Sequence, residues 1–367
     1  MKNKEKKRTF KRLDEDIEKS KANKIPFDID SDRFIFLSDI HKGDRQKGSD
    51  DFERNEALYC YALDYYFRKN FKLVLAGDVE EGWECKYEKI IDCYKDTAFK
   101  MEKLFVEKGR YHRIYGNHDC DLAERANVDK FLGPILGNME VYPALFIGDK
   151  IIVVHGHQGD GHSDRENWVR SRWFVKVFWK FAQNVFKAMN NRAAKNNKIR
   201  SKRDRYLFDW AKSKKILLIA GHTHRGMFES YSKTYQLFKK KLELENQLGR
   251  TTDTAEKLLL KEALKKIEEI IAESKEELRK EKTTSRVEEN PVPCYFNDGC
   301  CVHTNGISGI EIDKGTIRLV KWELSDTTCS EDVDGKIRPA NIIGPERKIY
   351  QSTDLNEIFE KIKSTTA

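Results

Sequence analysis

Five short stretches, far apart in the chain, place metal-ligand side chains directly after apolar runs. They are Asp39-Ile40-His41 after FIFLS, Gly77-Asp78 after LVLA, Gly116-Asn117-His118-Asp119 after HRIY, His155-Gly156-His157 after IIVV, and Gly221-His222-Thr223-His224 after ILLIA. Such short apolar runs are typical of buried strands, and open α/β sheets carry functional groups where strands end. Six of the nine histidines fall in these stretches. The pattern therefore predicts an α/β fold with a metal centre built from five strand ends.

The donor atoms in these stretches are carboxylates, imidazoles and an amide oxygen. A single His or Asp after an apolar run is usually a cap or a turn residue. Five such coincidences, all with oxygen or nitrogen donors, instead indicate a shared metal centre. These donors suit Mn, Fe, Zn or related divalent cations, and the lack of a Cys ligand disfavours a purely structural zinc site.

In order and identity, the motifs DxH, GD, GNHD, HGH and GHTH resemble those of the calcineurin-like metallophosphoesterase family, over roughly residues 33–322. The resemblance implies a four-layer α/β/β/α sandwich, to which the residue pattern of this chain adds a helical lid segment and a helical hairpin insertion. It also implies two divalent metal ions, Mn first, with Fe, Zn, Ni or Co as alternatives. The first ion would be held by Asp39, His41, Asp78 and His224. The second would be held by Asp78, Asn117, His155 and His222, so that Asp78 bridges the pair.

Two cations about 3.5–4 Å apart can share a hydroxide, lower its pKa towards neutrality and bind phosphoryl oxygens during in-line attack. The expected reaction is hydrolysis of a phosphate ester or pyrophosphate by a metal-bridging hydroxide. His118 directly follows the ligand Asn117, which makes it a candidate proton donor to the leaving oxygen. By resemblance, Glu81 orients this histidine. Arg225 is a candidate phosphate contact, and His157 has no ligand role in the resemblance.

At 367 residues, the chain can form one large α/β domain with insertions. Apolar runs predict strands at about 72–76, 111–115, 145–154 and 215–220 after a first strand at 34–38, and helical spacing predicts helices at 51–69 and 87–108. YFNDGCCVH and GIEIDKGTIRLVKWEL read as closing strands with an Asp-Lys-Gly turn. The predicted domains are a charged N-terminal arm at 1–28, a core at 29–228 and 291–325 with a lid at about 165–212, a helical hairpin at 229–290, and a C-terminal extension at 326–367.

The predicted hairpin has leucines and isoleucines at helical spacing on both sides of a GRTTDT break. Two interpretations stay open. The hairpin is either a self-packed antiparallel arm with a solvated outer face, or an arm for homodimerisation or partner docking, since two apolar helix faces can match a copy of themselves.

The basic excess of the chain is local. Residues 165–215 hold sixteen Lys or Arg against three acids, a net charge of +13, whereas the whole chain carries +8. Within this stretch, residues 166–190 form an amphipathic pattern with border tryptophans and a basic face. Three interpretations compete: peripheral contact with an anionic membrane or a lipid-bearing substrate, steering of nucleotide or nucleic-acid phosphates, and a lid helix whose charges are merely solvated. No nucleic-acid-binding motif is visible, which disfavours a polynucleotide.

The basic segment resembles the lid of the UDP-2,3-diacylglucosamine pyrophosphohydrolases of lipid A synthesis. The chain departs from those enzymes in carrying GNHD for GNRD and HGH for HGD. It also lacks the Arg of the GDxxDRG motif of protein Ser/Thr phosphatases. A branch of the family outside both groups fits these motifs best. The expected substrate is a small-molecule, nucleotide or lipid-linked phosphoester or pyrophosphate.

No apolar run approaches the roughly 20 residues of a membrane span, and the N-terminus has no apolar signal segment. The eight cysteines have no paired metal spacing, which is typical of reduced thiols. These features predict a cytoplasmic protein, with membrane association as the alternative. Two other functional classes stay open: a phosphodiesterase or nuclease acting on nucleic acid, and a partner-docking protein with a vestigial metal site. The intact ligand set argues against the last of these.

Overall fold

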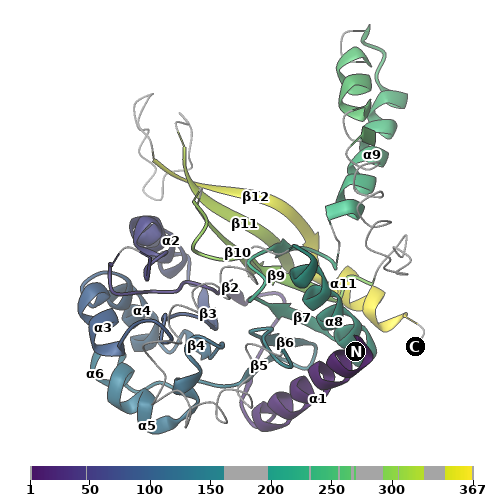
Figure 1. Cartoon of the computed structure of the whole chain (residues 1–367). Helices are drawn as coiled ribbons and strands as arrows, with labels where there is room; N and C mark the ends of the chain where they lie inside the picture. Colours follow the sequence, from purple (N-terminus) through teal and green to yellow (C-terminus); the bar gives the residue numbers. More distant parts are fainter. Residues whose placement is uncertain are drawn as a thin grey trace. The chain divides into compact units, whose positions relative to one another are not determined.

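The computed structural model describes residues 2–46, 48–160, 197–230, 233–254, 257–265, 268–269, 292–304, 306–325 and 344–365. The chain divides into two compact units, one formed by Met1–Phe228 with Cys294–Ala367 and the other by Glu229–Pro293. The first unit contains two six-stranded sheets with helices on their outer faces, the α/β/β/α arrangement predicted from the sequence (Figure 1).

One sheet carries the first three ligand motifs. Its strand order is β12-β11-β10-β2-β3-β4. The strands are β2 (Arg33–Leu37), β3 (Lys72–Ala76), β4 (Tyr111–Ile114), β10 (Ile307–Asp313), β11 (Thr316–Ser325) and β12 (Gly344–Asp354). β2, β3 and β4 run parallel, whereas β10 pairs antiparallel with both β2 and β11. The strands predicted at 34–38, 72–76 and 111–115 are confirmed to within one residue, and so is the turn between β10 and β11, where Lys314 and Gly315 have positive φ.

The other sheet carries the last two ligand motifs. Its order is β1-β5-β6-β7-β9-β8. The strands are β1 (Lys24–Ile25), β5 (Ala144–Ile147), β6 (Ile151–Val154), β7 (Leu217–Ala220), β8 (Gly226–Met227) and β9 (Tyr295–Asp298). β6, β7 and β9 are parallel neighbours. Every residue of β6 and β7 is buried, which matches their continuous apolar sequences.

The single strand predicted at 145–154 is wrong. This stretch is a hairpin in which β5 and β6 pair antiparallel, with Ile147 opposite Ile151. The chain reverses at Gly148, whose φ of 57° suits glycine. The Gly-Asp-Lys sequence between the two apolar runs is a turn signal, and the prediction of one long strand did not take it into account.

Helices cover the outer face of each sheet (Figure 1). α2 (Glu56–Arg68), α3 (Tyr87–Tyr94) and α4 (Ala98–Glu107) lie with the sheet of β2, β3 and β4, and α1 (Lys2–Ser20) and α8 (Asn197–Lys214) contact the other sheet. The helix predicted at 87–108 is therefore two helices, because Thr97, with φ −126° and ψ −96°, leaves the helical conformation. Shorter helical segments complete this region: η1 (Glu53–Asn55), η2 (Cys120–Ala123), α5 (Arg125–Asn127), η3 (Val128–Leu132) and α6 (Gly133–Leu136).

Both ends of the chain take part in the first unit. α1 lies in the segment predicted as a charged arm, and it buries Leu13 and Ile17. β12 and α11 (Leu355–Lys363) lie in the predicted C-terminal extension. β12 pairs with β11 along its whole length, and α11 buries Leu355, Ile358 and Ile362.

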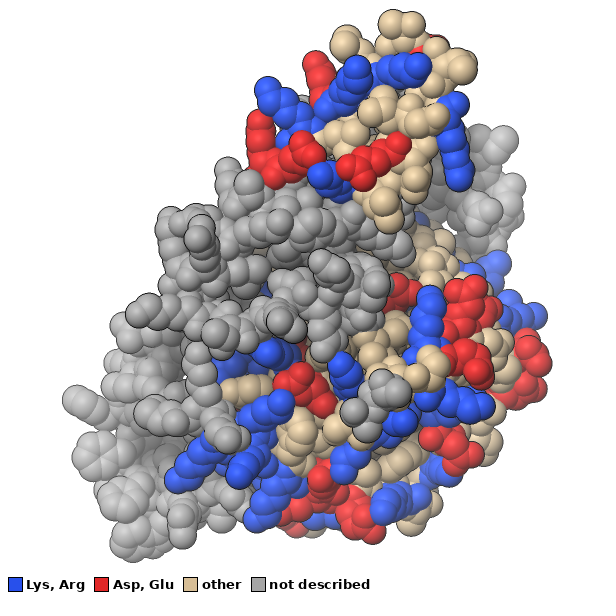
Figure 2. Space-filling model, turned by 90° about the vertical axis from the view of Figure 1, so that its right-hand side faces the viewer, with Lys and Arg blue, Asp and Glu red and all other residues tan. Residues whose placement is uncertain are grey.

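Part of the predicted lid, residues 161–196, lies outside the described residues, and with it the amphipathic pattern at 166–190. α8 forms the end of the predicted lid segment. On the face of α1, α8 and α11, Lys and Arg are interspersed with Asp and Glu among the described residues (Figure 2). Within the described parts of the chain, none of the helices is both long enough and apolar enough to cross a membrane.

The second unit contains α9 (Lys233–Arg250) and a further helical stretch at 257–265. An ion pair of 2.6 Å between Lys241 Nζ and Glu268 Oε1 links the two sides of the break. Three leucines of this unit are more than half exposed: Leu242, Leu258 and Leu259. Residues 270–290, the end of the predicted hairpin, lie outside the described residues.

Candidate metal centre

The five ligand motifs follow five strands whose carboxyl ends meet. Asp39 and His41 follow β2, Asp78 follows β3, and Asn117 follows β4 in the first sheet; the remaining motifs follow β6 and β7 in the second sheet. Because β2, β3 and β4 are parallel to one another, as are β6 and β7, each set places its motifs at one edge.

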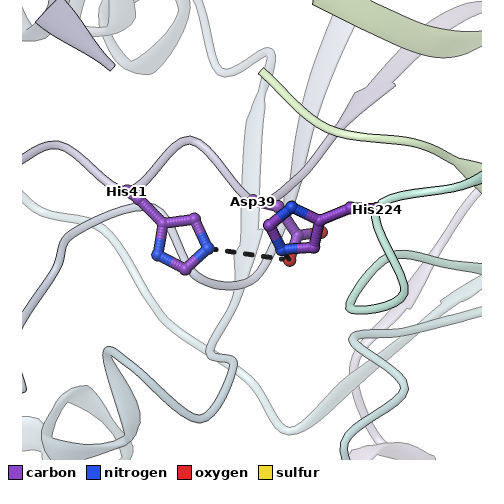
Figure 3. A group of neighbouring side chains, drawn as sticks. All are labelled: Asp39, His41 and His224. Carbon is purple, nitrogen blue, oxygen red and sulfur yellow. Dashed lines mark ion pairs between the residues drawn. The ribbon is translucent and has the colours of Figure 1, made fainter. Parts of the chain in front are cut away.

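The first cluster consists of Asp39, His41 and His224 (Figure 3). His224 Nε2 lies 3.0 Å and His41 Nε2 lies 3.9 Å from Asp39 Oδ1. Asp39 is fully buried, and its other carboxylate oxygen accepts the backbone N–H of His222 at 2.8 Å. One carboxylate oxygen is thus held by the backbone, while the other faces two imidazole nitrogens.

The second cluster consists of Asp78, His155 and His222. His155 Nε2 lies 3.0 Å from Asp78 Oδ2, and the same oxygen is 3.9 Å from His41 Nε2 in the first cluster. His155 Nδ1 faces the carbonyl oxygen of Ala76 at 2.9 Å, which leaves Nε2 for the centre. Asp78 therefore stands between the two clusters, as expected for a bridging carboxylate.

Buried polar atoms without hydrogen-bond partners test whether these residues fit metal ions. Among the described residues, four such atoms belong to predicted ligands: Asp39 Oδ1, His41 Nε2, Asn117 Oδ1 and His155 Nε2. Asp39 Oδ1 and His155 Nε2 have the ion-pair contacts of 3.0 Å given above, but the geometry of these contacts is not that of a hydrogen bond. A buried polar atom that forms no bond costs roughly 1–3 kcal/mol, so such atoms are uncommon in native structures. Coordination by cations would satisfy all four. The donor set and its burial fit two divalent metal ions.

The backbone of the ligand loops is strained. Five predicted ligands have φ between 50° and 67°: Asp39, His41, Asp78, His222 and His224. Residues other than glycine rarely adopt this left-handed conformation, which costs on the order of 1–3 kcal/mol per residue. Such strain persists where function requires a particular side-chain direction, and here it turns the side chains after β2, β3 and β7 into one centre.

The glycine of the GNHD motif has a steric role. A Cβ atom on Gly116 would lie 2.1 Å from Asp78 Oδ1. Any other residue at this position would therefore displace the carboxylate of Asp78. The motif requires glycine because the backbone after β4 approaches the ligand that follows β3.

A family model described as calcineurin-like phosphoesterase matches residues 32–226, which is more than half of the chain. The chain belongs to this family. No curated protein and no solved structure matches it. The matched segment contains all five ligand motifs, so the family and the geometry agree on the same region of the molecule.

In this calcineurin-like phosphoesterase, Glu81 joins two histidines. Its Oε2 lies 2.9 Å from His41 Nδ1, and its Oε1 lies 2.7 Å from His118 Nδ1. Burial raises the pKa of Glu81, but the imidazoles of His118 and His41 lower it to about 2, so the group is ionised. One carboxylate thereby directs the Nε2 atoms of both histidines. Trp83 stacks on His118, with ring centroids 4.2 Å apart.

His118 also lies within a third group of candidate ligands, together with His41 and Asp78. Its backbone N–H donates to Asp78 Oδ1 at 2.8 Å, and its ring stands edge-on to His41 at 4.6 Å between centroids. The side chain is therefore at the centre, close enough to reach either a metal or a bound substrate. Its role as proton donor stays a prediction.

The carboxylates and imidazoles set one another's protonation. Burial lowers the pKa of His155, but Asp78 raises it to about 9. Burial also lowers the pKa of His224, whereas Asp39 and Cys300 raise it to about 10. Positive charge is thus favoured in both clusters. Cations that bind there displace these protons, because a metal ligand must be deprotonated.

The remaining predicted residues lie at the margin of the centre. The guanidinium of Arg225 lies 3.6 Å from the buried carboxylate of Asp204, which offsets part of its charge. His157 is buried, and its ring lies 5.4 Å from that of His155. Sequence reasoning missed Asp160, whose Oδ2 is 3.6 Å from His222 Nε2. Its position five residues after His155 in the HGH loop was the available signal.

A buried ionic network beneath the loops was also missed. It consists of Lys42, Glu80, Glu102, Arg113 and Asp119, all fully buried. Arg113 bonds Glu80 and Asp119, and Lys42 Nζ lies 2.7 Å from Glu102 and 3.3 Å from Glu80. Asp119 in turn accepts the backbone N–H of Gly116 at 2.6 Å and of Val79 at 3.0 Å. Lys42, Glu80 and Asp119 are each next in sequence to a predicted site residue, so three ligand loops share this one network.

Proposed function

We propose that this protein is a dinuclear metal-dependent phosphoesterase. The observation that carries the proposal is the convergence of the ligand motifs from five strand ends. Four buried ligand atoms after β2, β4 and β6 form no hydrogen bond, and the backbone is strained after β2, β3 and β7. The family match and the candidate ligand clusters support a metal-dependent hydrolase of phosphoesters. The ligand set proposed for the first ion is Asp39, His41, Asp78 and His224, and for the second ion Asp78, Asn117, His155 and His222.

Two divalent cations held in this way would supply an activated water and neutralise phosphoryl oxygens. The chain's own residues supply the rest. Glu81 holds the Nδ1 proton of His118, so that Nε2 can carry a proton to the leaving oxygen. Trp83 fixes the plane of the same ring by stacking. Asp78 holds the two ligand sets together from a loop whose backbone is bonded to Asp119.

We infer that the substrate is a phosphate ester or pyrophosphate of a small, nucleotide or lipid-linked molecule. The sequence argument is the net charge of +13 at residues 165–215, which begins directly after the HGH loop. A concentrated positive field next to a catalytic centre raises the local concentration of anionic substrates. The structural support is the 2.7 Å contact between His118 Nδ1 and Glu81, which suits the proposed proton donor, because proton donation matters most for a poor leaving group.

The test is metal analysis combined with three assays. Purified protein supplied with Mn²⁺ is offered p-nitrophenyl phosphate, bis-p-nitrophenyl phosphate and a UDP-sugar, which separates monoesterase, diesterase and pyrophosphatase. The proposal expects about two Mn²⁺ per chain and hydrolysis of at least one substrate class. Asp78→Asn removes a charge from both ligand sets, so it should release both ions and abolish hydrolysis.

The matched control is Asp149→Asn, since Asp149 is an exposed aspartate in the β5–β6 turn and should retain metal and activity. An Asp78→Asn protein that keeps two tightly bound ions and full activity contradicts the ligand assignment. Two bound ions without hydrolysis of any phosphoester would instead favour the partner-docking alternative.

A further inference from the structure

The helix α1 contacts the loop that carries His155. The family match begins at residue 32, so α1 precedes the part of the chain that the family shares. Gly159 of this loop lies so close to α1 that a Cβ atom on it, where φ is 76°, would meet Thr9 Cα at 2.5 Å. The residue at 159 must therefore be glycine for the helix to pack on the loop.

Two arginines bind the carbonyl groups of this loop. Arg8 of α1 donates from Nε and Nη2 to the carbonyl oxygen of Gly159, at 2.9 and 2.7 Å. Arg203 of α8 donates from Nη2 to the carbonyl oxygens of Gly156 and Gln158, at 2.8 and 2.7 Å. Three carbonyl groups in four residues are thus fixed by charged donors, which form stronger hydrogen bonds than neutral ones.

Further side-chain contacts join the loop to α1. Arg203 Nη1 donates to Thr9 Oγ1 at 3.1 Å, so the arginine of α8 that binds the loop also binds α1. Gln158 accepts the backbone N–H of Gly156 at 3.0 Å and donates to Asp16 of α1 at 3.2 Å. Thr9, Asp16, Gln158 and Arg203 are all buried. Hydrogen bonds shielded from water in this way restrict the loop to one conformation.

The loop begins at a predicted ligand and ends beside another. His155 lies 3.0 Å from Asp78, and at the far end Asp160 lies 3.6 Å from His222. We propose that α1 is a positioning element for the second metal-binding cluster, and that Arg8 is its main positioning residue. The inference rests on the proposed dinuclear centre. It extends that proposal by assigning a function to a helix outside the family match.

Arg8 can be changed without undocking the helix, because α1 has other anchors. Lys6 Nζ lies 2.6 Å from Asp209 of α8, and the indole N–H of Trp210 donates to Asp14 at 3.0 Å. Leu13 and Ile17 are buried on the other turns of the helix. The loss of the Arg8 side chain should therefore loosen the loop and leave α1 in place.

The experiment measures Mn²⁺ binding by calorimetry in full-length protein stripped of metal with a chelator. Arg8→Ala should weaken the second site by about 10- to 100-fold, the range for residues that orient metal ligands, and leave the first site within about twofold. His155→Asn removes a ligand of the second cluster only, and so identifies which binding step belongs to it. Lys7→Ala, a change at an exposed neighbour that also removes one positive charge, should leave both affinities unchanged.

Arg8→Lys keeps the charge and one donor, so its affinity for the second ion should lie between those of Arg8→Ala and the unmodified protein. An Arg8→Ala protein with a lower melting temperature but unchanged Mn²⁺ affinity would overturn the inference, because α1 would then be merely structural. Equal losses in Arg8→Ala and Lys7→Ala would overturn it as well, since net charge would explain both. Fewer than two ions in the unmodified protein would instead show that the dinuclear proposal had failed.

Discussion

His118 is the residue whose chemistry can be separated from metal binding. Its Nδ1 is occupied by Glu81, and in our proposal its Nε2 contacts the substrate. His118→Asn should keep both metal ions and slow turnover of a substrate with a poor leaving group by about 10²–10⁴-fold. The defect should be smaller for p-nitrophenyl phosphate, because p-nitrophenolate leaves without protonation. Steady-state kinetics on an alkyl and a p-nitrophenyl ester, with metal analysis beside them, measure both effects.

The result that contradicts this role is loss of metal from His118→Asn, which would move the residue into the ligand set, as its place in the third candidate group allows. Glu81→Gln supplies a second readout. It should weaken metal binding as well as proton transfer, because Glu81 also holds His41.

His155 should make stability depend on pH when the centre holds no metal. Asp78 raises the pKa of His155 to about 9, above its usual 6.5. A raised pKa contributes stability that is fully present below pH 6.5 and is lost as the pH rises through about 9. We therefore expect the difference in melting temperature between chelator-treated protein and its His155→Gln variant to shrink from pH 6.5 to pH 10. Thermal melts across this range measure it, and a difference that stays constant would contradict the ion pair.

The loops that carry the predicted ligands are joined by the buried ionic network. Arg113, on β4, bonds carboxylates from the loops after β3 and β4. Arg113→Met would leave Glu80 and Asp119 buried without this cation, and breaking a buried pair in this way costs about 3–5 kcal/mol. We expect a loss of that size in the free energy of unfolding measured with urea.

The control for this element is Arg68→Met, which breaks an exposed ion pair with Asp64 on α2. Exposed pairs contribute about 0–1 kcal/mol, so its unfolding should barely change. Equal effects of the two substitutions would show that the network does not stabilise the loops. If Arg113→Met unfolds at the same urea concentration as the unmodified protein but binds metal more weakly, the network positions the ligand loops more than it stabilises the fold.

At the scale of the whole molecule, the second unit can be removed. The strand before residues 229–290 is β8 and the strand after them is β9. These two strands pair with each other, and Met227 lies opposite Asn297. A short Gly/Ser linker in place of 229–290 should leave metal content and phosphoesterase activity intact. If the exposed leucines at 242, 258 and 259 form a dimer interface, the same change should halve the mass measured by light scattering.

If the protein has the mass of a monomer both before and after the replacement, the dimerisation hypothesis is wrong and the interpretation as a self-packed arm is left. Loss of folding would show that the second unit stabilises the first.

Binding of the unmodified protein to anionic vesicles, measured by cosedimentation, tests the prediction that the basic segment at residues 165–215 contacts an anionic membrane. Each Lys or Arg near the membrane surface contributes about 1 kcal/mol to such binding.

The local pattern of the sequence predicted the candidate ligand residues and most strands of the core. A short apolar run predicts a buried strand, and a His, Asp or Asn directly after it predicts a ligand at the end of that strand. Both signals lie within a few neighbouring residues, so β2, β3, β4 and β7 were predictable. The same local pattern gave a wrong prediction at Gly148, because two short apolar strands joined by a tight turn have nearly the same apolar sequence pattern as one long strand.

Only the tertiary structure decided which distant residues hold those ligands in place. Arg8 and Gly159 are 151 positions apart, and Arg113 reaches Glu80 across 33. A charged residue in a sequence usually lies on a solvated surface, so nothing local marks Lys42, Glu80 or Arg113 as buried. Their burial follows from the pairing of β2, β3 and β4, which brings opposite charges of the neighbouring loops together. Local chemistry thus predicted the residues of the candidate site, and long-range packing decided which residues hold them.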